Sequence, residues 1–133
     1  MFVHFLDLSY LRLTYRPDLH TLFMRWTRPV SSEEHRLGYQ QALAMAQPLG
    51  AGHWLVDLRS RGLASAEDFE WVLKDLRAQL VEALPQTSPR LAYLTTPNHQ
   101  ATILERLKNP ELRGGFRSFI EEAPAQQWLE TGS

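Results

Sequence analysis

The sequence contains no cysteine, no long apolar run and no marked excess of charge of either sign. The lack of cysteine excludes disulfides and thiolate nucleophiles and is typical of a reducing compartment, so we expect a cytoplasmic protein. No apolar run approaches the roughly 20 residues needed to cross a bilayer, so we expect no membrane span. The 14 basic and 15 acidic residues nearly cancel, which predicts no nucleic-acid partner.

Residue groupings that would bind a metal or a cofactor are also missing. Five histidines fall on different predicted elements without the close spacing of a zinc site: His4, His20, His35, His53 and His99. The Gly50-Ala51-Gly52 string precedes a predicted strand, which is the wrong side for a phosphate-binding loop. No serine, histidine and aspartate pattern resembles a nucleophile elbow. We therefore expect no metal, no cofactor and no enzymatic activity.

The sequence does contain enough apolar residues for one domain. Hydrophobic residues make up 44% of the 133, and a chain of this length buries roughly two thirds of the surface that its unfolded form exposes. No linker or internal repeat divides it. We assign residues 1–130 to a single domain and residues 131–133 to a frayed or cloning-derived tail.

Hydrophobic periodicity places the strands. Apolar and polar residues alternate over 10–15 and again over 21–26, with a Pro-containing turn between them, which predicts an antiparallel hairpin. The short apolar runs 54–56 and 91–94 predict strands buried on both faces, and 116–120 predicts a last strand.

Four helices are predicted between and after these strands. Their starts share a capping residue or a favourable first turn: Ser31 with Glu34, Ser65 with Asp68, Thr96 before Pro97, and Glu121-Glu122. One apolar stripe at helical spacing is expected to pack on the sheet: Phe69, Val72, Leu73 and Leu76. The order is β-β-α-β-α-β-α-β-α. It predicts an α/β domain with a mixed, mostly parallel sheet, an N-terminal antiparallel hairpin and crossover helices.

With this order of elements, the chain resembles the SpoIIAA-like or STAS-like family, and in particular its small bacterial members. Four strings carry the resemblance: Trp26 followed by 31–34, the strand 53–59, the helix start 67–71, and 116–119 leading to Glu122-Ala123 and Trp128-Leu129. The resemblance implies a STAS-like fold and a regulatory or protein-interaction function. Some relatives are switched by phosphorylation of a Ser or Thr in an Asp-Ser-Ser-Gly-like string. Here that string is replaced by residues 57–62, Asp-Leu-Arg-Ser-Arg-Gly.

The segment that follows the strand 54–56 is the candidate functional surface. Open α/β sheets meet ligands at the carboxyl ends of their strands. The candidate partner or ligand residues are Asp57, Arg59, Ser60, Arg61 and Ser65. Two arginines beside a helix N-terminus suit an anionic group or an acidic patch on a partner. We expect this loop to be exposed and both arginines to be removable without unfolding the domain.

Each candidate also has a structural interpretation. Asp57 either acts as a general base or metal ligand, or it pairs with Arg59 or Arg61. Ser65 either carries a phosphate beside these arginines or simply caps its helix, with Ser60 as a solvated loop residue.

Three functions are compatible with these observations. The first is a non-enzymatic regulatory or protein-interaction module with another protein as its partner. The second is a carrier of a small apolar ligand, with a pocket between sheet and helices and Asp57 or Arg59 at its mouth. The third is a hydrolase or isomerase whose site the sequence does not reveal.

Overall fold

Six strands form one mixed sheet in which each strand lies beside its neighbours in sequence, in the order β1 to β6. The structure is a computed structural model that describes residues 4–108 and 115–132. The strands are β1 (Phe5–Asp7), β2 (Leu11–Arg16), β3 (Thr21–Trp26), β4 (His53–Asp57), β5 (Arg90–Leu94) and β6 (Phe116–Phe119). β1, β2 and β3 pair antiparallel, and β3 to β6 pair parallel. The predicted α/β class and the antiparallel hairpin are confirmed.

The first strand was not predicted. β1 pairs with β2 through only three residue pairs, from Phe5 opposite Thr14 to Asp7 opposite Arg12. Three residues are too few for a period-two pattern to stand out, so the pairing depends on the neighbouring strand.

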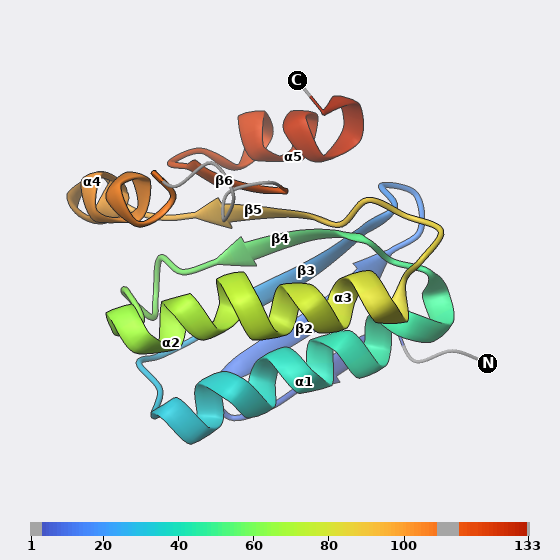
Figure 1. Ribbon diagram of the computed structural model, residues 1–133, viewed down its shortest axis with the longest axis horizontal. Helices are drawn as coiled ribbons and strands as arrows, with labels where there is room; N and C mark the ends of the chain where they lie inside the picture. The colour runs from blue at the N-terminus through green and yellow to red at the C-terminus, as the bar shows by residue number, and fades with distance from the viewer. Residues whose placement is uncertain (1–3, 109–114, 133) are drawn as a thin grey trace.

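Helices cover the two faces of the sheet unequally (Figure 1). The helices are α1 (Ser32–Leu49), α2 (Ala66–Trp71), the π-helical turn η1 (Val72–Leu76), α3 (Arg77–Ala83), α4 (Pro97–Arg106) and α5 (Glu122–Thr131). α2, η1 and α3 follow one another without a break and lie alongside α1 on one face, whereas α5 lies on the opposite face. The sheet therefore has more helical cover on the α1 side than on the α5 side.

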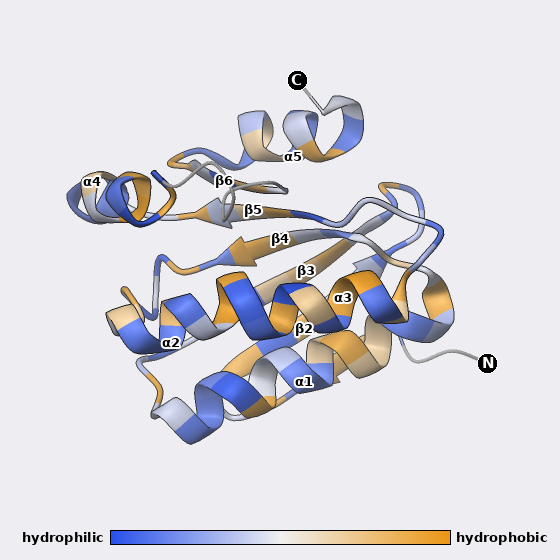
Figure 2. Cartoon of the chain, in the orientation of Figure 1, coloured by the Kyte–Doolittle hydropathy of each residue, from blue (hydrophilic) through white to orange (hydrophobic). Residues whose placement is uncertain are grey.

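The core is divided in the same way, because side chains alternate between the faces of each strand. The α1 side holds the larger cluster, which includes Trp26, Trp54 and Tyr93 from the strands. The α5 side holds a smaller cluster, with Phe23 and Leu55 from the strands packed near Trp128 of α5. Figure 2 shows that the central strands β3, β4 and β5 are largely apolar.

Local capping agrees with the predictions for two of the helices. Ser31 and Glu34 form a complete capping box at α1, and the Ser65 side chain accepts a hydrogen bond from the backbone N–H of Asp68. Pro97 occupies the first turn of α4, but Thr96 makes no capping bond to the backbone. The predicted apolar stripe on α2 and η1 is buried, as expected: Phe69, Val72, Leu73 and Leu76.

The C-terminal boundary needs correction. Thr131, which we placed in a tail, is the last residue of α5, and Gly132 ends the helix with a φ of 79°. The Gly132 N–H donates to the Trp128 carbonyl at 2.7 Å, as expected for a left-handed helix cap. The Asn109-Pro110 string, which predicts the end of the helix that begins after Thr96, lies outside the described residues. Across the described part of the chain, no helix has the length and apolar character of a membrane-spanning segment.

Candidate functional site

The predicted loop, residues 58–65, leaves the carboxyl end of β4 as expected. It turns at once, because the N–H groups of Arg61 and Gly62 both donate to the carbonyl of Leu58. Gly62 has a φ of 83°, a conformation that an L-residue adopts only with strain. The tight turn sends Arg59 and Arg61 to opposite faces of the sheet, so the candidate residues do not form one cluster.

On the α5 side, Asp57 is the centre of an ion-pair network. The Arg59 guanidinium donates to both carboxylate oxygens of Asp57, at 3.0 and 2.9 Å. The backbone N–H of Arg59 donates to the same carboxylate. Arg25 of β3 donates from Nη1 to Asp57 Oδ2 at 2.9 Å. Burial alone raises the pKa of Asp57, but these hydrogen bonds outweigh it and the pKa lies below its usual value.

Glu122, in the first turn of α5, completes what we call the Asp57 network (Arg25, Asp57, Arg59 and Glu122). Its carboxylate lies 2.9 Å from Arg25 Nη2 and 4.0 Å from Arg59 Nη2. Sequence analysis predicted the Asp57–Arg59 pair as one alternative and missed Arg25 and Glu122. Strand alternation had placed Arg25 on the face opposite Trp26, but its partner depends on the register that aligns Arg25 with Asp57.

On the α1 side, Arg61 contradicts the expectation of an exposed loop arginine, because only 8% of it is accessible. Its Nη2 lies 2.8 Å from Nδ1 of His35, and its guanidinium carbon lies 4.4 Å from the centre of the Trp26 ring. No carboxylate among the described residues lies within ion-pair distance of it. Arg61 therefore stabilises the loop against the core and is unavailable to a partner.

His35 is a neutral acceptor in this arrangement. Arg61 donates to its Nδ1, so the ring proton lies on Nε2, which donates to the carbonyl of Asp68 at 3.0 Å. Burial, and then the neighbouring Arg61 charge, lower the pKa of His35 to about 4. The ring also packs against Trp26, Tyr39 and Trp71. These contacts give His35 a structural role.

Both candidate serines lie where the structural interpretation predicts them. Ser65 is exposed and caps α2, and Ser60 is exposed at the tip of the loop. Arg61 points into the core, so it is not placed to bind a phosphate on Ser65. Whether either hydroxyl is modified stays a prediction.

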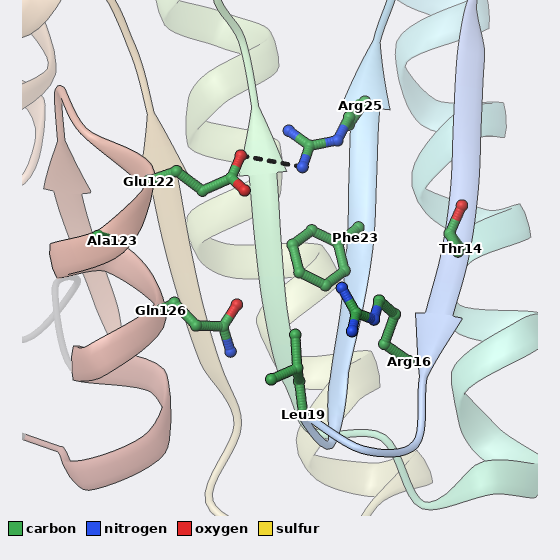
Figure 3. Close-up of a pocket in the computed structure, with 8 residues that line it drawn as sticks. All are labelled: Thr14, Arg16, Leu19, Phe23, Arg25, Glu122, Ala123 and Gln126. Atoms are coloured by element: carbon green, nitrogen blue, oxygen red, sulfur yellow. Dashed lines mark ion pairs between the residues drawn. The ribbon is translucent and has the colours of Figure 1, made fainter.

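A pocket opens next to the Asp57 network, on the part of the sheet that α5 leaves uncovered. Its volume is about 530 Å³, within the usual range for small-molecule sites. We call it the β3–α5 pocket, and its lining residues are Thr14, Arg16, Leu19, Phe23, Arg25, Glu122, Ala123 and Gln126. Figure 3 shows Phe23 at its centre, with Arg25 toward one end and Arg16 toward the other.

The surroundings of Asp57 favour its pairing with arginine over the role of a general base or metal ligand. Asp57 is held as an anion by two arginines, so it is poorly suited to accept a proton as a general base. Within residues 4–108 and 115–132, no three His, Cys, Asp or Glu side chains gather as a metal site.

Comparisons with protein-family models, with curated proteins and with solved structures found no match for this chain.

Proposed function

We propose that the protein is a non-enzymatic interaction module that binds an acidic segment of a partner protein at the outer side of the Asp57 network. The observation that carries the proposal is the arrangement of Arg25 and Arg59 around one carboxylate. Asp57 forms ion pairs with both guanidinium groups and holds them in place. The Arg59 side chain stays 45% exposed. A pre-positioned, partly exposed arginine is a favourable anchor for a protein interface.

Glu122 leaves Arg59 available to the partner's acidic group. It is half-exposed, and its 4.0 Å distance to Arg59 is too long for a hydrogen bond. An incoming carboxylate that approaches Arg59 at hydrogen-bonding distance would make a stronger contact than Glu122 does. Because Asp57 stays in place, the arginine needs no reordering when the partner binds.

The STAS-like resemblance agrees with this function and remains a hypothesis about ancestry. It implied a partner-binding loop after the central strand, and the Asp57 network lies at the start of that loop. The proposed surface differs from the one expected from sequence, since it includes Arg25 and Glu122 and excludes Arg61.

A display library of random peptides tests the proposal against a defined partner chemistry. Peptides selected on the wild-type protein should be rich in Asp and Glu, and Arg59→Gln should weaken their binding about tenfold. Arg12→Gln is the matched control, because Arg12 pairs with Asp7 on the same sheet face but outside the network. The proposal fails if selected peptides show no acidic preference, or if both variants weaken them equally.

A further inference from the structure

We infer that the β3–α5 pocket is a binding site for a small molecule with a flat apolar body and one carboxylate group. This inference is independent of the proposed partner surface, although the two sites share Arg25 and Glu122. It rests on the apolar centre of the pocket, on the different states of its two arginines, and on its shape between a strand and a helix.

The apolar part of the ligand would contact the small accessible part of Phe23 together with Leu19 and Ala123. This ring is at the centre of the pocket (Figure 3) and is 7% accessible, because Arg25 and neighbouring side chains pack around it. The Arg25 guanidinium lies 5.2 Å from the centre of the ring. Leu19 and Ala123 add apolar surface on either side of it. Because Arg25 lies over the ring and little of Phe23 is accessible, a flat ring system would contact Phe23 edge-to-face and pack against Leu19 and Ala123.

The carboxylate would bind to Arg16, because Arg16 can be recruited and Arg25 cannot. Arg25 donates to the buried Asp57 and to Glu122 and is held by both. Arg16 pairs with Asp18, and both side chains are more than half exposed, at 52% and 61%. Exposed pairs of this kind contribute little stability, roughly 0 to 1 kcal/mol, so a ligand can compete for Arg16.

The geometry of the pocket also orients the ligand. Arg16 lies near the turn between β2 and β3, whereas Glu122 lies at the opposite end of the pocket (Figure 3). Arg25, the lining arginine beside Glu122, is already paired with Glu122 and Asp57, so the anionic end of the ligand belongs beside Arg16. Gln126 is held in place on the wall, since its Nε2 donates to the Thr21 hydroxyl at 2.9 Å.

Calorimetric titration with 2-naphthoate tests this inference. We expect measurable binding of 2-naphthoate, at least about tenfold weaker binding of the neutral 2-naphthamide, and no detectable binding of acetate. Arg16→Gln should weaken 2-naphthoate about tenfold, and the exposed control Arg12→Gln should leave it unchanged. Ala123→Leu should also weaken binding without altering any charge, because the added side chain takes up part of the pocket.

Three results would overturn the inference. One is no binding of 2-naphthoate, and another is equal binding of the acid and the amide. The third is binding of unchanged affinity in both Arg16→Gln and Ala123→Leu. The acidic peptides provide a separate readout: if Arg16→Gln weakens them as much as Arg59→Gln does, the pocket belongs to the protein-binding surface and the small-ligand site is wrong. Loss of peptide binding in Arg59→Gln alone leaves the two sites distinct.

Discussion

The loop after β4 carries two arginines whose side chains lie in opposite environments. Arg59 and Arg61 are two positions apart, yet Arg59 lies half-exposed in an ion-pair network and Arg61 lies buried among aromatic rings. Arg59 finds two carboxylates nearby, whereas Arg61 finds a histidine nitrogen and the face of Trp26. The partner of each arginine, and with it the arginine's role, therefore depends on which face of the sheet its side chain reaches.

The two arginines also differ in how much their removal should change the stability of the fold. A surface ion pair contributes little net stability because water solvates both charges well. A buried guanidinium is costly to desolvate, so its removal has consequences that depend on the cavity and the polar groups left behind. Two donors in this region, Arg61 Nη1 and Trp26 Nε1, have no hydrogen-bond partner among the described residues. The free energy of unfolding should therefore respond strongly to substitution of Arg61 and weakly to substitution of Arg59.

The largest effect is expected for Arg61→Ala, which should lower the free energy of unfolding by about 4 kcal/mol. It removes the stacked guanidinium from Trp26 and leaves His35 Nδ1 without its donor. Urea denaturation measures the change, with Leu73→Ala as an apolar reference expected to cost roughly 2 to 5 kcal/mol. Arg61→Met should cost less, since it fills much of the same volume. A loss within about 0.5 kcal/mol for Arg61→Ala would show that the buried arginine is not structural.

An intermediate effect is expected from acid acting on His35. Its pKa is about 4 in the folded protein against 6.5 for the free side chain. The unfolded chain therefore takes up a proton between these values that the native protein does not, and stability is lost as the pH falls through this window. The loss should be about 2 kcal/mol between about pH 7 and pH 4.5.

Urea denaturation at both pH values measures this loss. His35→Gln is the comparison variant, because a glutamine amide can accept from Arg61 and donate to the Asp68 carbonyl without titrating. It should show a smaller decrease than the wild type, and an equal decrease in both proteins would assign the pH dependence to other groups.

The smallest effect is expected for Arg59→Gln, which should change the free energy of unfolding by no more than about 0.5 kcal/mol. Asp57 keeps Arg25 as a charged partner, and the Arg59 backbone N–H still donates to it. Thermal and urea unfolding both measure the change. A larger loss would show that Arg59 has a structural role like that of Arg61. The double removal of Arg59 and Arg61, first expected to leave the domain folded, should instead destabilise it about as much as Arg61→Ala alone.

Much of the fold was predictable because its signals are local. Capping of α1 depends on residues three apart, Ser31 and Glu34, and the apolar stripe around Leu73 repeats along a single helix. Such patterns act within a few residues, so tertiary contacts need not be known. The candidate site was predictable only in part. Asp57 and Arg59 are only two positions apart along the chain, whereas Arg25 and Glu122 come from distant segments.

The sequence by itself determined the α/β class, the hairpin, most helix boundaries and the place of the loop after β4, since periodicity, caps and turn residues act locally. Tertiary structure alone decided that Arg25 aligns with Asp57, that α5 brings Glu122 beside them, and that Arg61 turns toward Trp26. It also decided that α5 covers only part of its sheet face and leaves the β3–α5 pocket open. The physical reason is that strand register and helix placement are set by packing between distant segments, which no local pattern encodes.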